Sequence, residues 1–190
     1  MARMLKEYAS LRRRPFLTPV WILGFLGLFA LGVAAWAVRE ASTTLVLVTR
    51  HAEKLADAVA DPALSPAGLA RAQRLASLLG DAPRELAVDA VFVTQWQRTA
   101  STALPLATRL GIPVIPVAAE DLAGLEARIR REYRGRRVLV IAHSDSVPVI
   151  VADLSQGAKV PPIADGEYGA VYLVAIPRWS RPSVLAMRLP

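Results

Sequence analysis

The stretch TTLVLVTRH at residues 43–51 decides the fold class of this 190-residue chain. Its first seven residues are apolar or β-branched without a break, which is typical of a strand buried inside a sheet. The run then ends in two polar residues, Arg50 and His51. We therefore expect a buried strand whose carboxyl end carries side chains suited to chemistry.

Five further runs downstream have the length and composition of strands. One of them is short and contains prolines, which cannot donate to a hydrogen-bond ladder, so we expect it at an edge of the sheet. The expected strands cover residues 90–94, 113–117, 138–142, 170–176 and 184–189.

Helical patterns fill the gaps between these strands. Ser65 has the character of an N-cap and precedes a proline, which suits the first helical position. Glycines 80, 111 and 135 are typical of helix ends. The expected helices cover residues 66–79, 97–110 and 120–134, with a short one from Ser146. This alternation predicts an α/β fold for residues 39–190, a three-layer sandwich with a mostly parallel central sheet.

A long uncharged run precedes the α/β region. Residues 16–38 hold no charged side chain, and Trp21 and Trp36 lie near the two ends. As a helix, this run would extend about 35 Å, enough for a hydrocarbon core of about 30 Å, and tryptophan favours the two interfaces. We expect a transmembrane helix or a signal segment at this place.

Basic residues gather before the uncharged run. Residues 1–15 hold five of the 23 lysines and arginines but one of the 16 acidic residues, so most of the net charge of +7 lies there. A body this mildly basic weakens a nucleic-acid interpretation, and we expect no nucleic-acid partner. The positive-inside tendency keeps residues 1–15 as a cytoplasmic arm and sends residues 39–190 outward.

A cleavable export signal is the alternative to a retained anchor. The sequence Arg13-Arg14-Pro15-Phe16-Leu17 resembles a twin-arginine motif, and Ala35-Trp36-Ala37 has the small-x-small form of a cleavage site. The protein is then either membrane-anchored, with its α/β domain on the periplasmic side, or an exported soluble protein. Both interpretations place the domain outside the cytoplasm.

The residue counts exclude several kinds of site. The chain has no cysteine, which excludes disulfide scaffolds, cysteine zinc sites and a cysteine nucleophile. Its two histidines cannot by themselves form an all-histidine metal site. We expect no metal and no cofactor.

Three of the expected strands direct polar residues to one place. The first strand ends in Arg50-His51, the second is followed within a turn by Arg98, and the strand at 138–142 runs directly into His143. Ligands of open α/β sheets bind outside the carboxyl ends of the strands. We therefore expect both histidines and both arginines to meet at one rim.

These residue types together suit the chemistry of a phosphoryl group. Two guanidinium groups present paired donors to a phosphate, and a neutral imidazole can attack phosphorus. A second imidazole can stabilise the charge of the transition state. We also expect the arginines to lower the pKa of the histidines by like-charge repulsion.

Four segments of the chain resemble the histidine phosphatase superfamily, also called the phosphoglycerate mutase-like family. They occur in the order found in that family, and alanine replaces the usual glycine after His51. The segments are Arg50-His51-Ala52, Leu64-Ser65-Pro66-Ala67-Gly68 with Ala72, Thr94 to Thr99 with Thr102-Ala103, and Ile141-Ala142-His143-Ser144.

The resemblance, closest to the small phosphatase branch, implies specific roles. His51 would be the phosphorylated nucleophile, with Arg50, Arg98 and His143 completing the phosphate pocket. The protein would be an extracytoplasmic phosphatase that hydrolyses phosphomonoesters or phosphohistidine through a covalent phosphohistidine. Its partner would be a phosphorylated small molecule, an envelope sugar or a lipid phosphate. The alternative is a non-catalytic envelope protein that binds a phosphoryl ligand in the same pocket.

The sequence permits more than one role for several charged residues. The catalytic acid of larger relatives has no match, and Glu120, Asp121 and Asp145 are candidates, each with a structural role in helix capping or dipole stabilisation as the alternative. Glu53 either orients Arg50 or is solvated. The arginine cluster at residues 128–137 is either a solvated helix face or a surface that attracts an anionic substrate or the membrane.

Overall fold

The computed structural model describes residues 17–41, 43–56, 59–83 and 86–189. The chain divides into two compact units, Met1–Glu40 and Ala41–Pro190. The basic arm expected at residues 1–15, with most of the twin-arginine-like sequence, lies outside the described residues.

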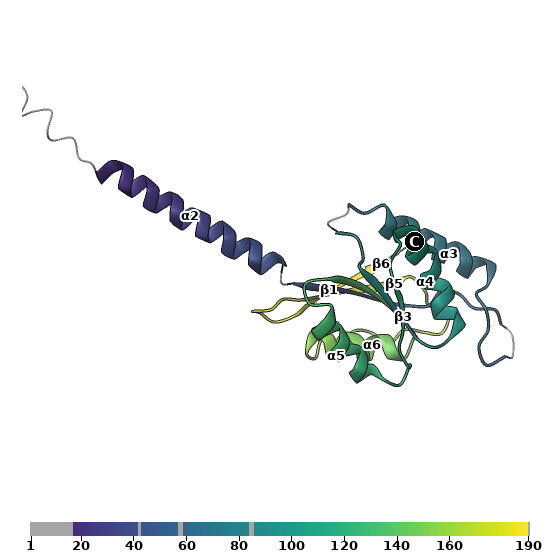
Figure 1. Cartoon of the computed structure of the whole chain (residues 1–190). Coiled ribbons are helices and arrows are strands. Elements are labelled where there is room, and N and C mark those ends of the chain that lie inside the picture. Colours follow the sequence, from purple (N-terminus) through teal and green to yellow (C-terminus); the bar gives the residue numbers. More distant parts are fainter. Residues whose placement is uncertain (1–16, 42, 57–58, 84–85, 190) are drawn as a thin grey trace, which may run out of the picture. The chain divides into compact units, whose positions relative to one another are not determined.

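The first unit contributes one long helix, α2 (Leu17–Ala41), which includes nearly all of the expected 16–38 segment (Figure 1). Its stretch Val20–Val38 has a mean hydropathy of 2.1, and none of it is buried in protein. A helix of this length and composition can cross a bilayer, and an export signal has the same properties.

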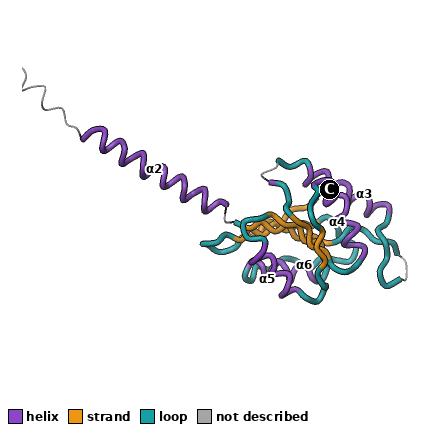
Figure 2. Tube along the Cα trace, viewed as in Figure 1, coloured by secondary structure: helices purple, strands orange, loops and turns teal. Residues whose placement is uncertain are grey.

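The second unit is built on a mixed sheet of six strands in the order β3-β2-β4-β1-β5-β6 (Figure 2). The first four strands in that order run parallel, whereas β5 is antiparallel to β1 and forms a hairpin with β6. The strands are β1 (Thr44–Arg50), β2 (Ala90–Val93), β3 (Val114–Pro116), β4 (Arg137–Ala142), β5 (Ala170–Ile176) and β6 (Ser183–Arg188). The parallel centre and the proline-containing edge strand match the sequence prediction.

Helices cover both faces of the sheet (Figure 1). They are α3 (Pro66–Gly80) and α4 (Gln97–Leu110) on one face, and α5 (Leu122–Glu132) and α6 (Ser146–Ser155) on the other. Alternation within the strands produces the two cores: Val46 and Val48 of β1 pack toward α5 and α6, whereas Leu47 packs toward α3 and α4. The expected three layers are therefore present.

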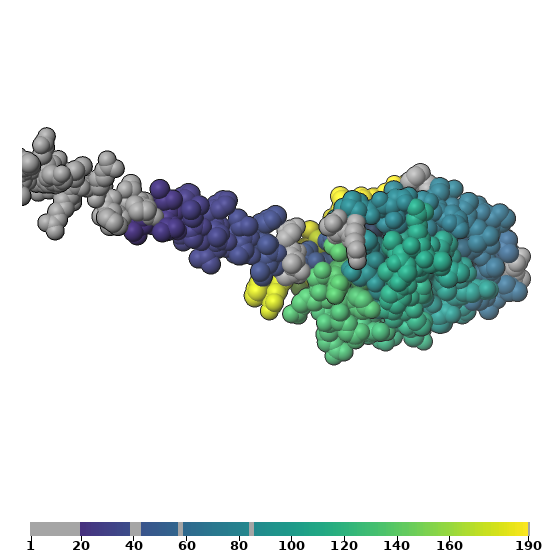
Figure 3. All heavy atoms as spheres, turned by 45° about the horizontal axis from the view of Figure 1, so that its top comes forward, coloured from purple at the N-terminus to yellow at the C-terminus, as the bar shows by residue number. Residues whose placement is uncertain are grey.

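The segments from residue 60 to 110, blue to teal, cover much of the visible side of this unit, and the green residues of α5 and α6 lie beside them (Figure 3).

The helix α5 is shorter than the expected 120–134. The side chain of Asp121 accepts from the Gly124 amide and so begins the helix after itself, and Tyr133 ends it.

The motif between residues 64 and 72 fixes the start of α3. Ser65 accepts from the Gly68 amide as an N-cap, and Pro66 occupies the first turn. A Cβ on Gly68 would lie 2.1 Å from the carbonyl oxygen of Glu53, so only glycine permits this approach. The close contact holds α3 against the segment that follows β1.

Candidate active site

Parallel pairing of β1 and β4 brings the two histidines together. Arg50 is in register with Ala142, and the amide of His51 donates to the carbonyl of Ala142 at 2.9 Å. His51 and His143 follow these paired positions directly, and their ring centroids lie 5.4 Å apart at an interplanar angle of 62°. The sequence prediction that both histidines meet at one rim is thus confirmed in the fold.

His51 has one ring nitrogen committed to the backbone. Its Nδ1 lies 2.7 Å from the carbonyl oxygen of Ala52. A carbonyl oxygen can only accept, so Nδ1 carries the hydrogen. In the neutral imidazole, the lone pair then lies on Nε2, which makes this atom available for attack on an electrophile.

The surroundings of His51 keep its ring neutral at pH 7. Burial makes the largest contribution and, with the positive charges of Arg50, His143 and Arg98, lowers the pKa from 6.5 to about 4. The sequence predicted this direction from the arginines alone. The larger cause is desolvation, because the side chain is only 3% exposed.

His143 is oriented by a chain of hydroxyl groups. Its Nε2 lies 3.0 Å from Oγ1 of Thr94, which lies 3.0 Å from Oγ1 of Thr99. Thr99 can donate its own hydrogen to the carbonyl of Trp96 at 2.8 Å, which leaves it able to accept from Thr94. Burial, followed by the charge of Arg98, lowers the pKa of His143.

Arg50 is held by a loop that the sequence patterns did not assign to the site. Its Nη1 donates to the carbonyls of Ala164, Asp165 and Glu167 at 2.7–3.0 Å. Its guanidinium also lies 4.4 Å from the ring centroid of Tyr168, which stands edge-on to His51. The loop between α6 and β5 therefore fixes the guanidinium beside the histidines.

Arg98 is held in a similar way by a second residue that the sequence prediction missed. Its Nη1 pairs with Oδ1 of Asp61 at 3.1 Å, and its guanidinium lies 4.9 Å from the Trp96 ring. The other oxygen of Asp61 accepts from the Gln97 amide at 2.8 Å, at the start of α4. Asp61 thus joins the β1–α3 segment to the helix that carries Arg98.

Two donors of these arginines have no hydrogen-bond partner among the described residues. Among the described residues, the buried side-chain nitrogens and oxygens without a hydrogen bond are Nε of Arg50 and Nε of Arg98. A buried N–H without an acceptor is costly, so such groups are rare unless a ligand completes them. Two buried guanidinium donors beside a neutral imidazole suit an oxyanion such as phosphate.

The remaining motif residues support this arrangement rather than joining it. Oγ1 of Thr102 accepts from the Ala52 amide at 3.0 Å and donates to the carbonyl of Arg98 at 2.7 Å, linking the two arginine-bearing segments. The methyl group of Ala52 packs in a small buried cluster with Leu64 and Ala72. This cluster explains why alanine fits where the family usually has glycine.

The candidate acids differ in their relation to the histidines. Asp121 caps α5, and Glu120 is exposed on the loop before it. Asp145 accepts from the Ser146 amide at 2.7 Å, and its charge, like that of Asp61, raises the pKa of His143 against the stronger lowering causes. Glu53 pairs with Arg71 at 2.8 Å, so neither of the roles considered for it, orienting Arg50 or being solvated, describes it.

Within the part of the chain that the structure describes, no three or more histidine, aspartate or glutamate side chains form a group that could hold a metal ion. The polar groups that converge here are donors to an anion.

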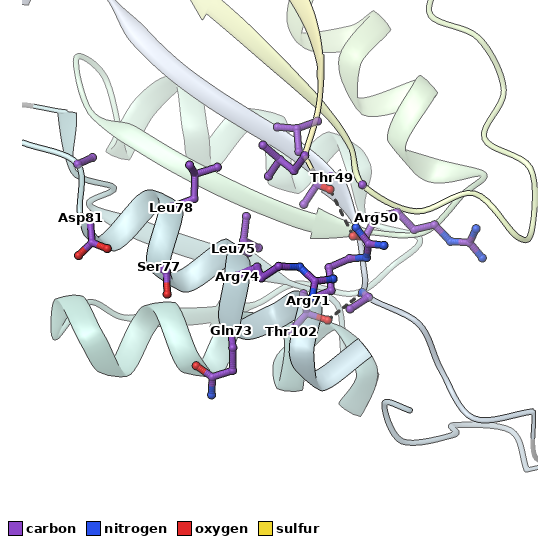
Figure 4. A pocket seen from close by; sticks show the side chains of 15 residues that line it. Thr49, Arg50, Arg71, Gln73, Arg74, Leu75, Ser77, Leu78, Asp81 and Thr102 are labelled. Atoms are coloured by element: carbon purple, nitrogen blue, oxygen red, sulfur yellow. Dashed lines mark hydrogen bonds between the residues drawn. The ribbon is translucent and has the colours of Figure 1, made fainter. Parts of the chain in front are cut away.

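A cavity adjoins the rim on the α3 side, and Arg50, Thr49 and Ala52 are among the residues that line it. It has a volume of about 600 Å³ and is mostly apolar, with lining side chains from α3 such as Leu75 and Leu78 (Figure 4). Figure 4 shows Arg71 and Arg74 of α3 directed toward the end of β1. Neither histidine lines this cavity, so its size does not identify it as the place where the reactive groups meet.

Comparison with a family model agrees with the motifs. The model described as histidine phosphatase superfamily (branch 1) matches residues 45–123, a segment that includes Arg50, His51 and Arg98. The resemblance seen in the sequence is thereby confirmed. No curated protein matches the chain by sequence.

Solved structures share the fold of the second unit. The protein histidine phosphatase SixA, solved with tungstate, aligns with a TM-score of 0.63 and 21% identity, covering 76% of this chain and 96% of SixA. A mycobacterial glucosyl-3-phosphoglycerate phosphatase gives 0.60 and 14%, covering 78% and 100%. A structure described as mycobacterial hydrolase 1 gives 0.61 and 15%, covering 77% and 99%. At these identities, the likeness establishes the fold.

Proposed function

From the match to the histidine phosphatase superfamily, we propose that this protein is a phosphatase that hydrolyses phosphomonoesters or phosphohistidine through a covalent phosphohistidine. One observation carries the proposal. A neutral His51, with its Nε2 lone pair free, lies beside two arginines that each keep a buried donor without a partner in the described part of the chain. This combination supplies a nucleophile and a binding site for the group it attacks.

The first step transfers the phosphoryl group to the protein. The phosphate accepts hydrogen bonds from Nε of Arg50 and Nε of Arg98, and Nε2 of His51 attacks phosphorus. A nitrogen–phosphorus bond forms while the bond to the leaving group breaks, and the electron pair departs with that group. The guanidinium groups and His143 stabilise the charge on the equatorial oxygens.

The second step releases inorganic phosphate. Water attacks the phosphorylated His51, the nitrogen–phosphorus bond breaks, and the neutral imidazole returns. The hydrogen bond from Nδ1 to Ala52 keeps the same nitrogen available in each cycle. The pKa of about 4 supports this role, because a protonated ring has no lone pair at Nε2.

Protonation of the leaving group falls to a carboxyl group near His143. Asp145 is better supported than Glu120 or Asp121, because its charge acts on His143. Asp61 has the same electrostatic relation and also pairs with Arg98. Both carboxylates already accept hydrogen bonds from backbone amides, which makes them poor proton donors. We therefore expect the fastest turnover with substrates whose leaving groups are weak bases, because these groups need no proton to depart.

We further propose that α2 is retained as a membrane anchor and that residues 43–189 lie on the periplasmic side. The uncharged run, its flanking tryptophans and the basic residues that precede it support this topology. The substrate would be a phosphorylated small molecule, an envelope sugar or a lipid phosphate. Sequencing the N-terminus of the mature protein distinguishes an anchor from a signal cleaved after Ala37, and a C-terminal reporter that is active only in the cytoplasm would contradict the topology.

Release of phosphate from an aryl phosphate by the detergent-solubilised full chain tests the activity. We expect turnover that a metal chelator leaves unchanged, since the proposed steps use no metal ion. His51→Ala serves as the matched control for contaminating phosphatases. Binding of inorganic phosphate without any turnover would instead identify the non-catalytic envelope protein.

A further inference from the structure

We propose that the end of the sheet opposite the catalytic rim is a docking surface for anionic lipid headgroups, which holds the catalytic pocket away from the bilayer. The surface consists of the β5–β6 hairpin tip, residues 177–182, together with Arg130 at the end of α5 and Arg134 just after it. This inference goes beyond the phosphatase activity and rests on the proposed anchoring by α2.

The hairpin tip has the side chains of a membrane interface. Ile176 of β5 pairs with Thr44, the first residue of β1, so the tip extends past the beginning of that strand. It carries Arg178, Trp179 and Arg181, and Trp179 is 70% exposed. The guanidinium of Arg178 lies 4.7 Å from the Trp179 ring centroid. Tryptophan with arginine favours the headgroup region, where the ring is partly dehydrated and the cation meets phosphate.

The arginines at the end of α5 adjoin the tip. Arg130 and Arg134 line a cavity of about 150 Å³ together with Thr44 and Arg178. The yellow hairpin tip and the green α5 lie at the same end of the unit (Figure 3).

Most of the arginines at this surface have no carboxylate partner among the described residues; Arg130 is the exception, since it pairs with Glu126 at 2.7 Å. Among the described residues, no carboxylate forms an ion pair with Arg134, Arg178 or Arg181. The neighbouring arginines of the 128–137 cluster differ, since Arg128 pairs with Glu132 and Arg136 pairs with Asp89. An external anion is therefore the available partner for the first group.

Chain connectivity brings this end of the sheet close to the lipid. The strand β1 begins at Thr44, three residues after Ala41, the last residue of α2. Three residues span at most about 11 Å. If α2 crosses the bilayer, the beginning of β1 and the surface beside it must stay near the headgroups, whatever the orientation of the two units.

The same connectivity limits the substrate. His51 lies seven residues beyond Thr44 along an extended strand, a distance of about 23 Å at about 3.3 Å per residue. With the opposite end docked, the catalytic rim opens into water. The substrate class becomes a water-soluble phosphate or a phosphate carried on a protein domain, rather than a lipid phosphate still embedded in the same membrane.

The cysteine-free chain allows a direct test with single labels. The full chain, as Ser180→Cys or as Glu120→Cys, is labelled with an environment-sensitive fluorophore and reconstituted into phosphatidylcholine vesicles with or without phosphatidylglycerol. Ser180 is at the tip, and Glu120 is exposed near the carboxyl end of β3. We expect headgroup-attached quenchers to quench the label at 180, more strongly with phosphatidylglycerol, and to spare the label at 120. Equal quenching at both positions, or quenching at 120 alone, would overturn the inference.

Charge reversal at the hairpin tip tests whether this surface binds lipid headgroups or whether α2 alone keeps the domain near the membrane. Arg178→Glu with Arg181→Glu should lower the ratio of docked to undocked protein by roughly 25-fold, since each basic residue near an anionic surface contributes about fivefold. Arg178→Glu alone should lower the ratio about fivefold, and its matched control on α3, Arg74→Glu, should not lower it. An unchanged ratio in the double variant would contradict the inference. Extraction by carbonate would overturn the anchoring and the docking together, whereas retention without quenching at 180 would overturn docking alone.

Discussion

The two arginines at the carboxyl rim differ from three arginines on and after α5 in the groups that hold them. At the carboxyl rim, Arg50 and Arg98 each stack on an aromatic ring and keep a buried Nε without an acceptor among the described residues. On and after α5, Arg128, Arg130 and Arg137 pair with carboxylates of Glu132, Glu126 and Asp89. The comparison teaches that an arginine remains available to a ligand where neighbouring groups orient it without satisfying all of its donors.

The largest effect is expected from removing the imidazole of His51, the proposed nucleophile that lies beside the rim arginines. His51→Ala should lower kcat for aryl phosphate hydrolysis by about 10⁴-fold or more, because no other group replaces the nucleophile. Steady-state phosphate release measures the loss, and a thermal melt close to that of the wild type confirms that the variant is folded. A fully active His51→Ala protein would contradict the account.

His143→Ala should slow both steps but retain some phosphorylation of His51.

Substituting arginines of each group tests the comparison itself. Arg50→Ala and Arg98→Ala should each lower kcat/KM by about 30- to 1,000-fold, or about 2–4 kcal/mol, because a charge-assisted contact to the phosphate is lost. Arg128→Ala is the matched control and should leave kcat/KM unchanged, since its partner is Glu132. Equal losses in both groups would show that the unpartnered donors have no special role.

Asp61 sharpens the comparison, because its carboxylate pairs with a rim arginine, Arg98. Asp61→Asn keeps the shape but removes the charge that orients Arg98. We expect kcat/KM to fall by about 3- to 10-fold, mainly through KM, since the pair is partly exposed and the guanidinium still stacks on Trp96. Glu132→Gln, which alters the pair of Arg128, is the control and should have no effect on either constant.

The smallest expected effect concerns pH. His51 takes up a proton near pH 6.5 when unfolded and near 4 when folded. Between these values the unfolded chain binds more protons, so lowering the pH through this window destabilises the fold, and raising it restores stability. The Tm of the wild type should therefore fall more than that of His51→Ala between about pH 7 and pH 5. The activity itself should persist until the pH approaches the folded pKa. A steeper loss of Tm in the variant would contradict the low pKa.

Much of the fold could be predicted because its signals are local. The apolar and β-branched run at 43–49, the capping of α3 by Ser65 and the glycine that ends α4 each act within a few residues. Alternation of strands and helices then placed Arg50, Arg98 and both histidines at one rim, because parallel strands share a carboxyl edge. The direction of β5 and β6 was not predicted, since an apolar run does not encode whether its neighbour runs parallel.

The partners of the site residues could not be predicted, for a related reason. The carbonyls that hold Arg50 come from residues 164–167, more than 110 positions away, in a loop without periodicity. Asp61 and Tyr168 likewise stand in irregular segments, where no spacing rule marks them. Sequence patterns also cannot tell a paired arginine from an unpaired one, so the sequence alone permits two interpretations of the 128–137 cluster.

Trapping the covalent intermediate tests the central claim most directly. The full chain is mixed briefly with a substrate carrying a labelled phosphoryl group, quenched without acid and digested for peptide mapping. The account predicts an acid-labile, base-stable label on the peptide that contains His51, present in His143→Ala and absent from His51→Ala. Label found only on the peptide that contains His143, or turnover without any labelled peptide, would contradict it.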